Sequence, residues 1–162
     1  MSAPRPPLRI LILCTGNSAR SQIAEALFNA RGHGRVVAAS AGSRPAPRVN
    51  SFAIAVLAEA GIDWQGRTPR GMDGLEREHW DLVITVCDRA RESCPYFPGH
   101  PVLAHWGMPD PADVEGSDEA KLAAFRDTLV TLSRRIDQFL ALPFERTECS
   151  ALAGQLKEIG NR

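Results

Sequence analysis

The sequence has no excess of charge of either sign and no long hydrophobic run. It contains 19 Lys and Arg and 19 Asp and Glu, so its formal net charge is zero. A neutral chain attracts neither nucleic acid nor an anionic membrane surface, and we expect neither as a partner. No apolar stretch reaches the roughly 18 residues of a membrane-spanning helix. The first residues, MSAPRPP, also lack the charged-then-apolar order of a secretory signal. We therefore expect a cytoplasmic protein.

Cysteine is scarce as well. The chain has Cys14, Cys87, Cys94 and Cys149. In a reducing compartment these are free thiols, which are either buried or chemically active. The spacing of Cys87 and Cys94 is not a usual zinc spacing, and no second close pair accompanies it. We predict no metal and no cofactor.

Short apolar runs and helical periodicity alternate along the 162 residues, a length that suits one domain. The patterns predict strands over 8–13, 35–42, 80–88 and 100–106, and helices over 21–32, 50–61 and 117–142. This alternation predicts an α/β fold, a three-layer αβα sandwich with a four-stranded parallel sheet. We expect the domain to cover 1–143. Residues 144–162 form a C-terminal extension, which is either a short helix or a mobile tail.

Three candidate residues follow predicted strands: Cys14, Cys87 and, in a loop, Asp110. In such sheets ligands bind beyond the carboxyl ends of the strands. We therefore expect these three residues to converge at one edge.

The segment CTGNSARS, 14–21, joins the first strand to the first helix. Backbone N–H groups at a helix N-terminus form a site for a phosphate-like oxyanion. The planar guanidinium of Arg20 can hold two oxygens of a tetrahedral anion. The same field favours the thiolate of Cys14, so we expect its pKa to fall below the ordinary value. Ser21 can donate to that thiolate, and Asn17 can hold the loop in place. The predicted oxyanion-binding residues are Thr15, Gly16, Asn17, Ser18, Ala19 and Arg20.

Two other interpretations of this loop deserve comparison. A buried cysteine at a strand end, with an arginine nearby by chance, would be purely structural. A nucleotide site fits poorly, because CTGNSARS has neither the Walker lysine nor three spaced glycines.

At this point the sequence resembles the low-molecular-weight protein tyrosine phosphatase superfamily, and within it the arsenate reductases. The resemblance spans roughly 8–142 and rests on three segments, CTGNSARSQIAEAL, VCDRARESC and HWGMPDPAD. The phosphatases usually have proline where this chain has Gln22. They also tend to place tyrosines after the Asp-Pro pair, where this chain has Ala112 and Asp113.

The resemblance implies roles for these residues. Cys14 attacks arsenate, Asp110 acts as the acid, and Cys87 attacks the arsenic–sulfur adduct and releases arsenite. Cys94 then attacks Cys87 and carries the disulfide to the surface. Without the resemblance, Asp110 would be a turn residue before Pro111. Cys87 and Cys94 would then be two core cysteines or a metal site, although their spacing is not a usual one for zinc.

The resemblance also implies a thioredoxin partner and a monomer. Related reductases use glutathione with glutaredoxin, or mycothiol, instead. Ala19 stands where the common three-cysteine version of the loop has a further cysteine, and Cys149 has no expected role.

Some members of the family bind potassium through four residues. Asn17, Glu25 and Ser40 match three of them, but Arg70 falls near the place of the fourth, an aspartate, and disfavours the ion.

Two other functions remain open on the sequence. One is a phosphatase of the same fold that hydrolyses phosphomonoesters through a phosphocysteine, with Asp110 as acid and then base. The other is a non-enzymatic module that senses oxyanions or redox state.

Overall fold

The computed structural model of the chain describes residues 6–92, 97 and 99–161. The strands and helices alternate along the described part. The strands are β1 Leu8–Cys14, β2 Val36–Gly42, β3 Leu82–Thr85 and β4 Val102–His105. The α helices are α1 Arg20–Arg31, α2 Ser51–Glu59, α3 Asp88–Glu92, α4 Asp118–Leu140 and α5 Cys149–Gly160. Two short 3-10 turns are η1 Leu75–Arg77 and η2 Pro111–Asp113.

The four strands form one parallel sheet in the order β2-β1-β3-β4. The apolar run of β1 accounts for its central place, because Ile10 and Leu11, which point to opposite faces, are both fully buried. This confirms the predicted four-stranded parallel sheet.

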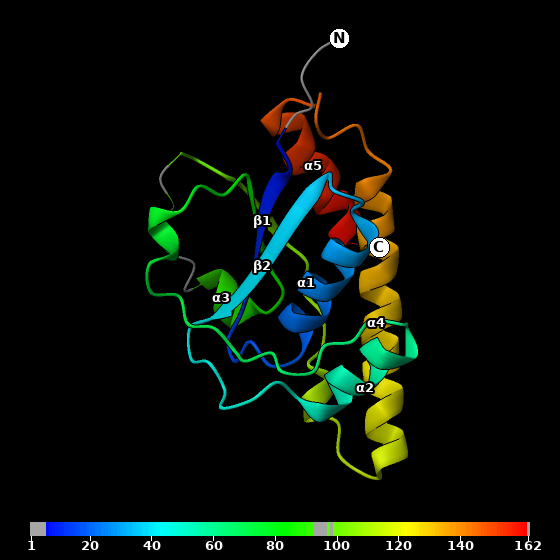
Figure 1. Ribbon diagram of the computed structural model, residues 1–162. Helices are drawn as coiled ribbons and strands as arrows, with labels where there is room; N and C mark the ends of the chain where they lie inside the picture. The colour runs from blue at the N-terminus through cyan, green and yellow to red at the C-terminus, as the bar shows by residue number, and fades with distance from the viewer. Residues whose placement is uncertain (1–5, 93–96, 98, 162) are drawn as a thin grey trace.

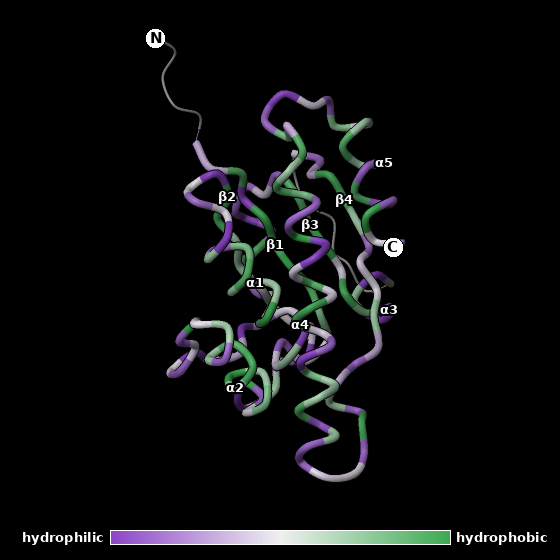
Figure 2. The backbone as a smooth tube through the Cα atoms, turned by 90° about the vertical axis from the view of Figure 1, so that its right-hand side faces the viewer, coloured by the Kyte–Doolittle hydropathy of each residue, from purple (hydrophilic) through white to green (hydrophobic). Residues whose placement is uncertain are grey.

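Helices and turns cover both faces of the sheet, which makes three layers (Figure 1). On one face Ile10 and Ile12 pack in the main core with apolar residues of α1, α2, α4 and α5. On the other face Leu11 and Leu13 pack with η1, Trp80 and Ala90 of α3. Figure 2 shows β1 largely hydrophobic in colour, whereas α4 alternates between hydrophobic and hydrophilic residues, as expected for a helix that lies on the surface.

The predicted helix starts agree with the structure. The side chain of Asn50 accepts a hydrogen bond from Phe52 N and caps α2, and that of Ser117 accepts one from Ala120 N and caps α4. The third and fourth strands are shorter than predicted. The chain leaves β3 early because Asp88 already begins α3, so Cys87 lies in the turn between the two elements.

The C-terminal extension is a helix that packs on the core. Leu152, Leu156 and Ile159 of α5 are buried in the main core. Trp106, which follows β4, donates from Nε1 to the carbonyl of Leu156 at 3.0 Å. Of the two alternatives left by the sequence, the helix is therefore the one observed. Among the described residues, no helix combines the length and the apolar character that crossing a membrane requires.

Candidate active site

The three predicted site segments meet at the carboxyl edge of the sheet. Cys14 ends β1, Cys87 follows β3, and Asp110 lies in the loop after β4. Arg20, the first residue of α1, connects them. Its Nη1 donates to the carbonyl of Met108 at 2.9 Å, and its Nη2 lies 3.5 Å from Asp110 Oδ2. The predicted convergence is confirmed.

The loop between β1 and α1 has its carbonyl groups turned outward. The carbonyls of Thr15, Gly16 and Ser18 accept hydrogen bonds of 2.8–2.9 Å from backbone N–H groups of the segment 44–50. In a trans peptide the next N–H points the opposite way. The N–H groups of Gly16, Asn17 and Ala19 therefore face the inside of the loop. This arrangement suits a tetrahedral anion.

The loop also requires a close approach by β2. A Cβ added at Gly42, the last residue of β2, would collide with the carbonyl oxygen of Thr15. A glycine at this position lets the chain after β2 run against the loop. That chain supplies the N–H groups that hold the carbonyls outward.

Asn17 is the residue that holds the loop in shape, as predicted. It is fully buried and has a φ of 51°, a conformation that asparagine tolerates better than most residues. Its Nδ2 donates to Ser21 Oγ and Ser40 Oγ, each at 2.8 Å, and its Oδ1 accepts from the backbone N–H of Arg70 at 2.7 Å. Because Ser21 Oγ accepts from Asn17, its own proton stays available for donation.

Gln22 is a site residue whose contacts sequence reasoning missed. Its Nε2 donates to both the carbonyl and Oδ1 of Asn17 at 3.0 Å, and its Oε1 accepts from Trp64 Nε1 at 2.8 Å. The signal was present, because Gln22 stands where the phosphatases usually have proline. Its partner Trp64 lies far along the chain, and no spacing pattern connects the two.

Arg20 is buried, and its Nε is a buried donor without a partner in the described structure. A buried unpaired N–H is costly unless a ligand accepts its hydrogen bond. An oxyanion in the loop would provide such an acceptor.

Asp110 has two contacts at the site, and the first of them is the turn role that the sequence left open. Its Oδ1 accepts from Ala112 N at 3.0 Å and begins the turn η2, which is the role of a turn residue. Its Oδ2 faces Arg20 across the site. The turn aims the second oxygen at the place where the anion would bind.

The structure corrects the predicted thiolate. Cys14 and Cys87 are hydrogen-bonded to each other, and that bond together with burial raises the pKa of Cys14. The same bond lowers the pKa of Cys87 to about 4. The prediction of a lowered pKa at Cys14 is therefore wrong for the free protein. Arg20 and the loop do lower the pKa of Cys14, as predicted. The prediction left out the sulfur of Cys87, which raises that pKa.

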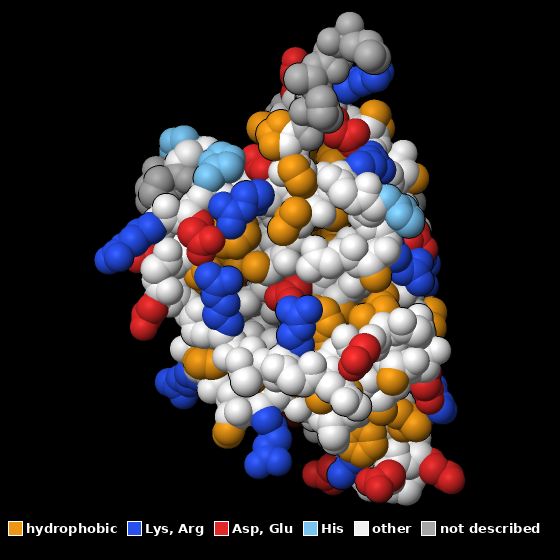
Figure 3. Space-filling view, viewed as in Figure 1, with side chains coloured by type: hydrophobic (Ala, Val, Ile, Leu, Met, Phe, Trp, Pro, Cys, Tyr) orange, Lys and Arg blue, Asp and Glu red, His pale blue; other side chains and the backbone are white. Residues whose placement is uncertain are grey.

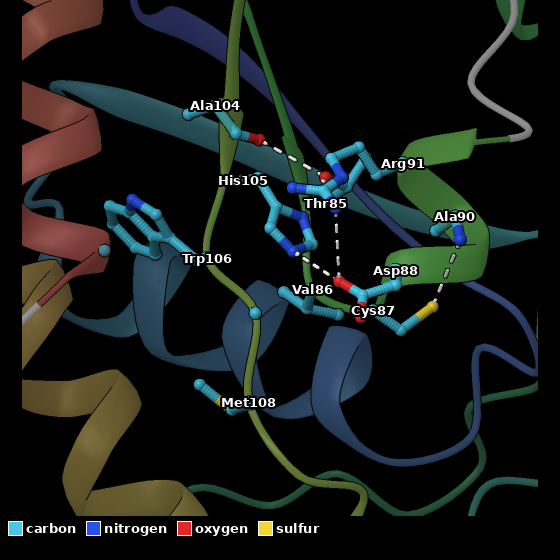
Figure 4. A network of polar contacts seen from close by, with 12 residues as sticks. Thr85, Val86, Cys87, Asp88, Ala90, Arg91, Ala104, His105, Trp106 and Met108 are labelled. Carbon is cyan, nitrogen blue, oxygen red and sulfur yellow. Dashed lines mark hydrogen bonds and ion pairs between the residues drawn. The ribbon is translucent and has the colours of Figure 1, made fainter.

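Cys87 has further contacts that favour its charged form. Its Sγ lies 3.4 Å from Thr15 Oγ1. It also accepts a hydrogen bond at 3.3 Å from the N–H of Ala90 in α3 (Figure 4). Both interactions lower its pKa. Cys94, the predicted third thiol, lies outside the described residues. Cys149, the first residue of α5, is an exposed free thiol.

The residues that the resemblance associated with potassium do not fit a cation. Asn17 turns its amide N–H groups toward Ser40 Oγ, and its oxygen already accepts from Gln22 and Arg70. Arg67 and Arg70 line the same cavity of about 400 Å³ as Glu25. Figure 3 shows basic side chains spread over the face of the molecule nearest the viewer. A cation requires oxygen ligands and a distance from other cations, and here two arginines share the cavity with the carboxylate of Glu25.

Fold and site together define an α/β protein whose loop of inward N–H groups lies beside a pair of cysteines. Residues 9–150 match the family described as low molecular weight phosphotyrosine protein phosphatase. The chain belongs to this family.

Similar proteins include both reductases and a phosphatase. The arsenate reductase of Halalkalibacterium halodurans is 39% identical over 130 residues, which cover 80% of this chain and 93% of that protein. The crystal structure of arsenate reductase from Archaeoglobus fulgidus has a TM-score of 0.64 and 33% identity, over 82% of this chain and 99% of that one. A low molecular weight protein tyrosine phosphatase from T. tengcongensis has a TM-score of 0.66 and 26% identity, over 80% and 95% of the two chains.

Proposed function

We propose that this protein is an enzyme that reduces arsenate to arsenite, with Cys14 as the nucleophile. The observation that carries the proposal is a second thiol at the loop of Cys14 and Arg20, because Cys87 Sγ lies 3.4 Å from the hydroxyl of Thr15, the residue after Cys14. A phosphatase of this fold needs one reacting thiol, because water completes its reaction. Reduction of arsenate takes two electrons, and two thiols supply them when they join as a disulfide. Relatives with substantial identity that are named arsenate reductases support the same conclusion.

The first step forms the bond between sulfur and arsenic. Arsenate binds with its oxygens on the loop N–H groups and on Arg20. Cys14 transfers its proton across the hydrogen bond to Cys87, and its sulfur attacks arsenic. One arsenate oxygen leaves as water, with a proton from Asp110.

The second step transfers the electrons. Cys87 loses its proton to solvent, and its thiolate attacks Cys14 Sγ. The sulfur–sulfur bond forms, the arsenic–sulfur bond breaks, and its electron pair stays on arsenic. Arsenic passes from As(V) to As(III) and leaves as arsenite.

The proposal also includes the return of the enzyme to its reduced state. Cys94 attacks Cys87, which frees Cys14 and leaves a Cys87–Cys94 disulfide. Thioredoxin, a dithiol donor, reduces that disulfide, in a cytoplasm that keeps the other thiols free. We propose that the enzyme acts as a monomer.

Hydrolysis of phosphomonoesters is the second candidate function. The inward N–H groups, Arg20 and Asp110 suit phosphate as well as arsenate, and a similar solved structure is a phosphatase. Phosphate transfer to Cys14 takes no electrons from a second thiol, so this activity does not require a disulfide with Cys87.

The test is arsenate-dependent oxidation of NADPH in the presence of thioredoxin and thioredoxin reductase. We expect turnover in the wild type and its loss in Cys14→Ser, Cys87→Ser and Cys94→Ser. Cys149→Ser is the matched control and should retain activity. Glutaredoxin with glutathione, and mycothiol, replace thioredoxin in parallel assays to identify the donor.

The opposite result is equally clear. If no donor supports arsenate turnover, while para-nitrophenyl phosphate is hydrolysed even in Cys87→Ser and Cys94→Ser, the protein is a phosphatase and the proposal fails.

A further inference from the structure

A histidine bridges the two ends of the turn that carries Cys87. His105, at the end of β4, is paired in register with Thr85 at the end of β3. Its Nδ1 lies 2.7 Å from Thr85 Oγ1, and its Nε2 lies 3.1 Å from Asp88 Oδ1, at the first residue of α3. Figure 4 shows the imidazole between strand and helix, with Cys87 in the turn that they enclose.

The chemistry of Asp88 determines the hydrogen bonding of the imidazole. An ionised carboxylate only accepts, so Nε2 carries a hydrogen and donates to it. Nδ1 then accepts from the Thr85 hydroxyl when the ring is neutral and donates to it when the ring is charged. Both bonds therefore persist in either protonation state. Asp88 is also 3.7 Å from Arg91 of the same helix, the other charged group that the described structure places against this carboxylate.

The fold leaves room for the ring. A Cβ added at Gly107 would lie 2.7 Å from His105 Nε2, so a larger residue there would displace the ring. The His105 side chain is only 21% exposed, whereas that of Asp88 is 78% exposed. The His105 ring is therefore held by the surrounding fold, and its hydrogen bond restrains the exposed side chain of Asp88.

We propose that His105 is a positioning residue that holds Cys87 against Cys14 through its hydrogen bond to Asp88. Thr85 and Asp88 lie two residues before and one residue after Cys87. Fixing both of them to one ring restricts the turn between them. The Cys87 sulfur is thereby kept within reach of Cys14 and of Ala90 N. The inference rests on the proposed function for its biological role, but not for its test.

The test measures how readily Cys14 and Cys87 join as a disulfide, without arsenate. In the full-length Cys94→Ser, Cys149→Ser chain these two thiols are the remaining cysteines. Oxidised glutathione accepts two electrons and two protons from them and becomes two reduced glutathiones. At half oxidation, the square of the concentration of reduced glutathione divided by the concentration of oxidised glutathione gives the effective concentration of one thiol at the other.

The variants separate positioning from charge. Asp88→Ala should lower the effective concentration about tenfold, as expected for the loss of one hydrogen bond to a charged group. Asp88→Asn keeps an accepting oxygen and should stay within about twofold of the parent, as should the control Arg91→Ala, which removes only the exposed ion pair. His105→Ala should lower the effective concentration as much as Asp88→Ala does. The double variant should lower it no further than either single variant, because the two residues act as one unit.

Hydrolysis of para-nitrophenyl phosphate serves as the second readout. It needs Cys14, Arg20 and Asp110 but no disulfide, and displacement of Cys87 removes a group that raises the pKa of Cys14, so hydrolysis should not fall in any variant. The inference is wrong if Asp88→Ala equals the parent, if Asp88→Asn loses as much as Asp88→Ala, if hydrolysis falls in parallel, or if the parent forms no Cys14–Cys87 disulfide. If the disulfide results hold and the wild type still releases no arsenite from arsenate, the proposed function alone fails.

Discussion

At the scale of the residue, the central feature is a pair of cysteines whose pKa values are shifted in opposite directions by their interaction. The hydrogen bond from Cys14 is the largest cause of the lowered pKa of Cys87, and Thr15 and Ala90 add to it. Arg20 lowers the pKa of both thiols. The shared interaction therefore raises the pKa of Cys14 and lowers that of Cys87, next to a loop that suits an anion.

This sharing predicts a change when one partner is removed. In Cys14→Ala the pKa of Cys87 should rise from about 4 toward the ordinary thiol range, because its main hydrogen-bond donor is lost. In the wild type the Cys87 thiolate persists as pH falls until about 4, whereas in the variant it is lost at higher pH. Ultraviolet thiolate absorbance, followed against pH in a Cys94→Ser, Cys149→Ser background, measures the shift.

Cys14→Ser is the control for this measurement. Its hydroxyl still donates to Cys87, so the pKa should stay closer to that of the wild type. Equal pKa values in the wild type and in Cys14→Ala would show that the interaction with Cys14 does not determine the charge of Cys87.

At the scale of the element, α5 joins the C-terminal extension to the loop that carries Asp110. Arg135 of α4 donates from Nη2 to the carbonyl of Gly160 at 3.1 Å, and from Nη1 to the carbonyls of Trp106 and Gly107 at 3.2 and 3.3 Å. The chain after β4 thus lies between α4 and the end of α5. The helix contributes to the shape of the site without reaching it.

Substitution by alanine should have opposite effects on stability at two glycines of α5. Gly154 is exposed within the helix, and an added Cβ meets nothing within 4 Å. Gly154→Ala should therefore stabilise the protein by about 0.5–1 kcal/mol. At Gly160 the added Cβ would lie 2.7 Å from Trp106 Cδ1 and 2.9 Å from the carbonyl oxygen of His105. Gly160→Ala should destabilise by about 1–3 kcal/mol.

Urea unfolding of the two variants beside the wild type measures both changes in the free energy of unfolding. If Gly160→Ala were as stable as Gly154→Ala, the close packing of α5 on Trp106 would not exist in solution.

At the scale of the whole molecule, the site draws on parts that are far apart in the sequence. The loop at 14–20 depends on the segment 44–50, on Arg70 and on the chain after β4. A ligand that binds there ties these parts together and is bound only by the folded chain. Binding should therefore stabilise the entire fold.

Phosphate is the simplest probe of this coupling. At a concentration ten times its Kd it should contribute about 1.4 kcal/mol and raise Tm by about 3–5 °C. Calorimetry with and without phosphate measures the shift. Arg20→Met, compared with itself in the two buffers, should lose most of it, and an equal shift in that variant would place the anion elsewhere.

The sequence by itself determined the layout of the fold and the chemistry of the loop. The apolar run of β1, the helical spacing of α4 and the caps at Asn50 and Ser117 are local patterns, and local patterns report local structure. The nucleophile, the arginine and the helix start also lie within a few residues, so their spacing was sufficient. The position of Asp110 beside Arg20 followed from the rule that parallel strands end at one edge.

Only the tertiary structure decided which side chains touch. Cys14 and Cys87, Gln22 and Trp64, and His105 and Asp88 are separated by many residues, and no periodicity relates the members of a pair. Their contacts depend on strand order, on register and on room left by Gly42 and Gly107. The charge of Cys14 was mispredicted for this reason, because a pKa depends on every neighbour in space and not only on those nearby along the chain.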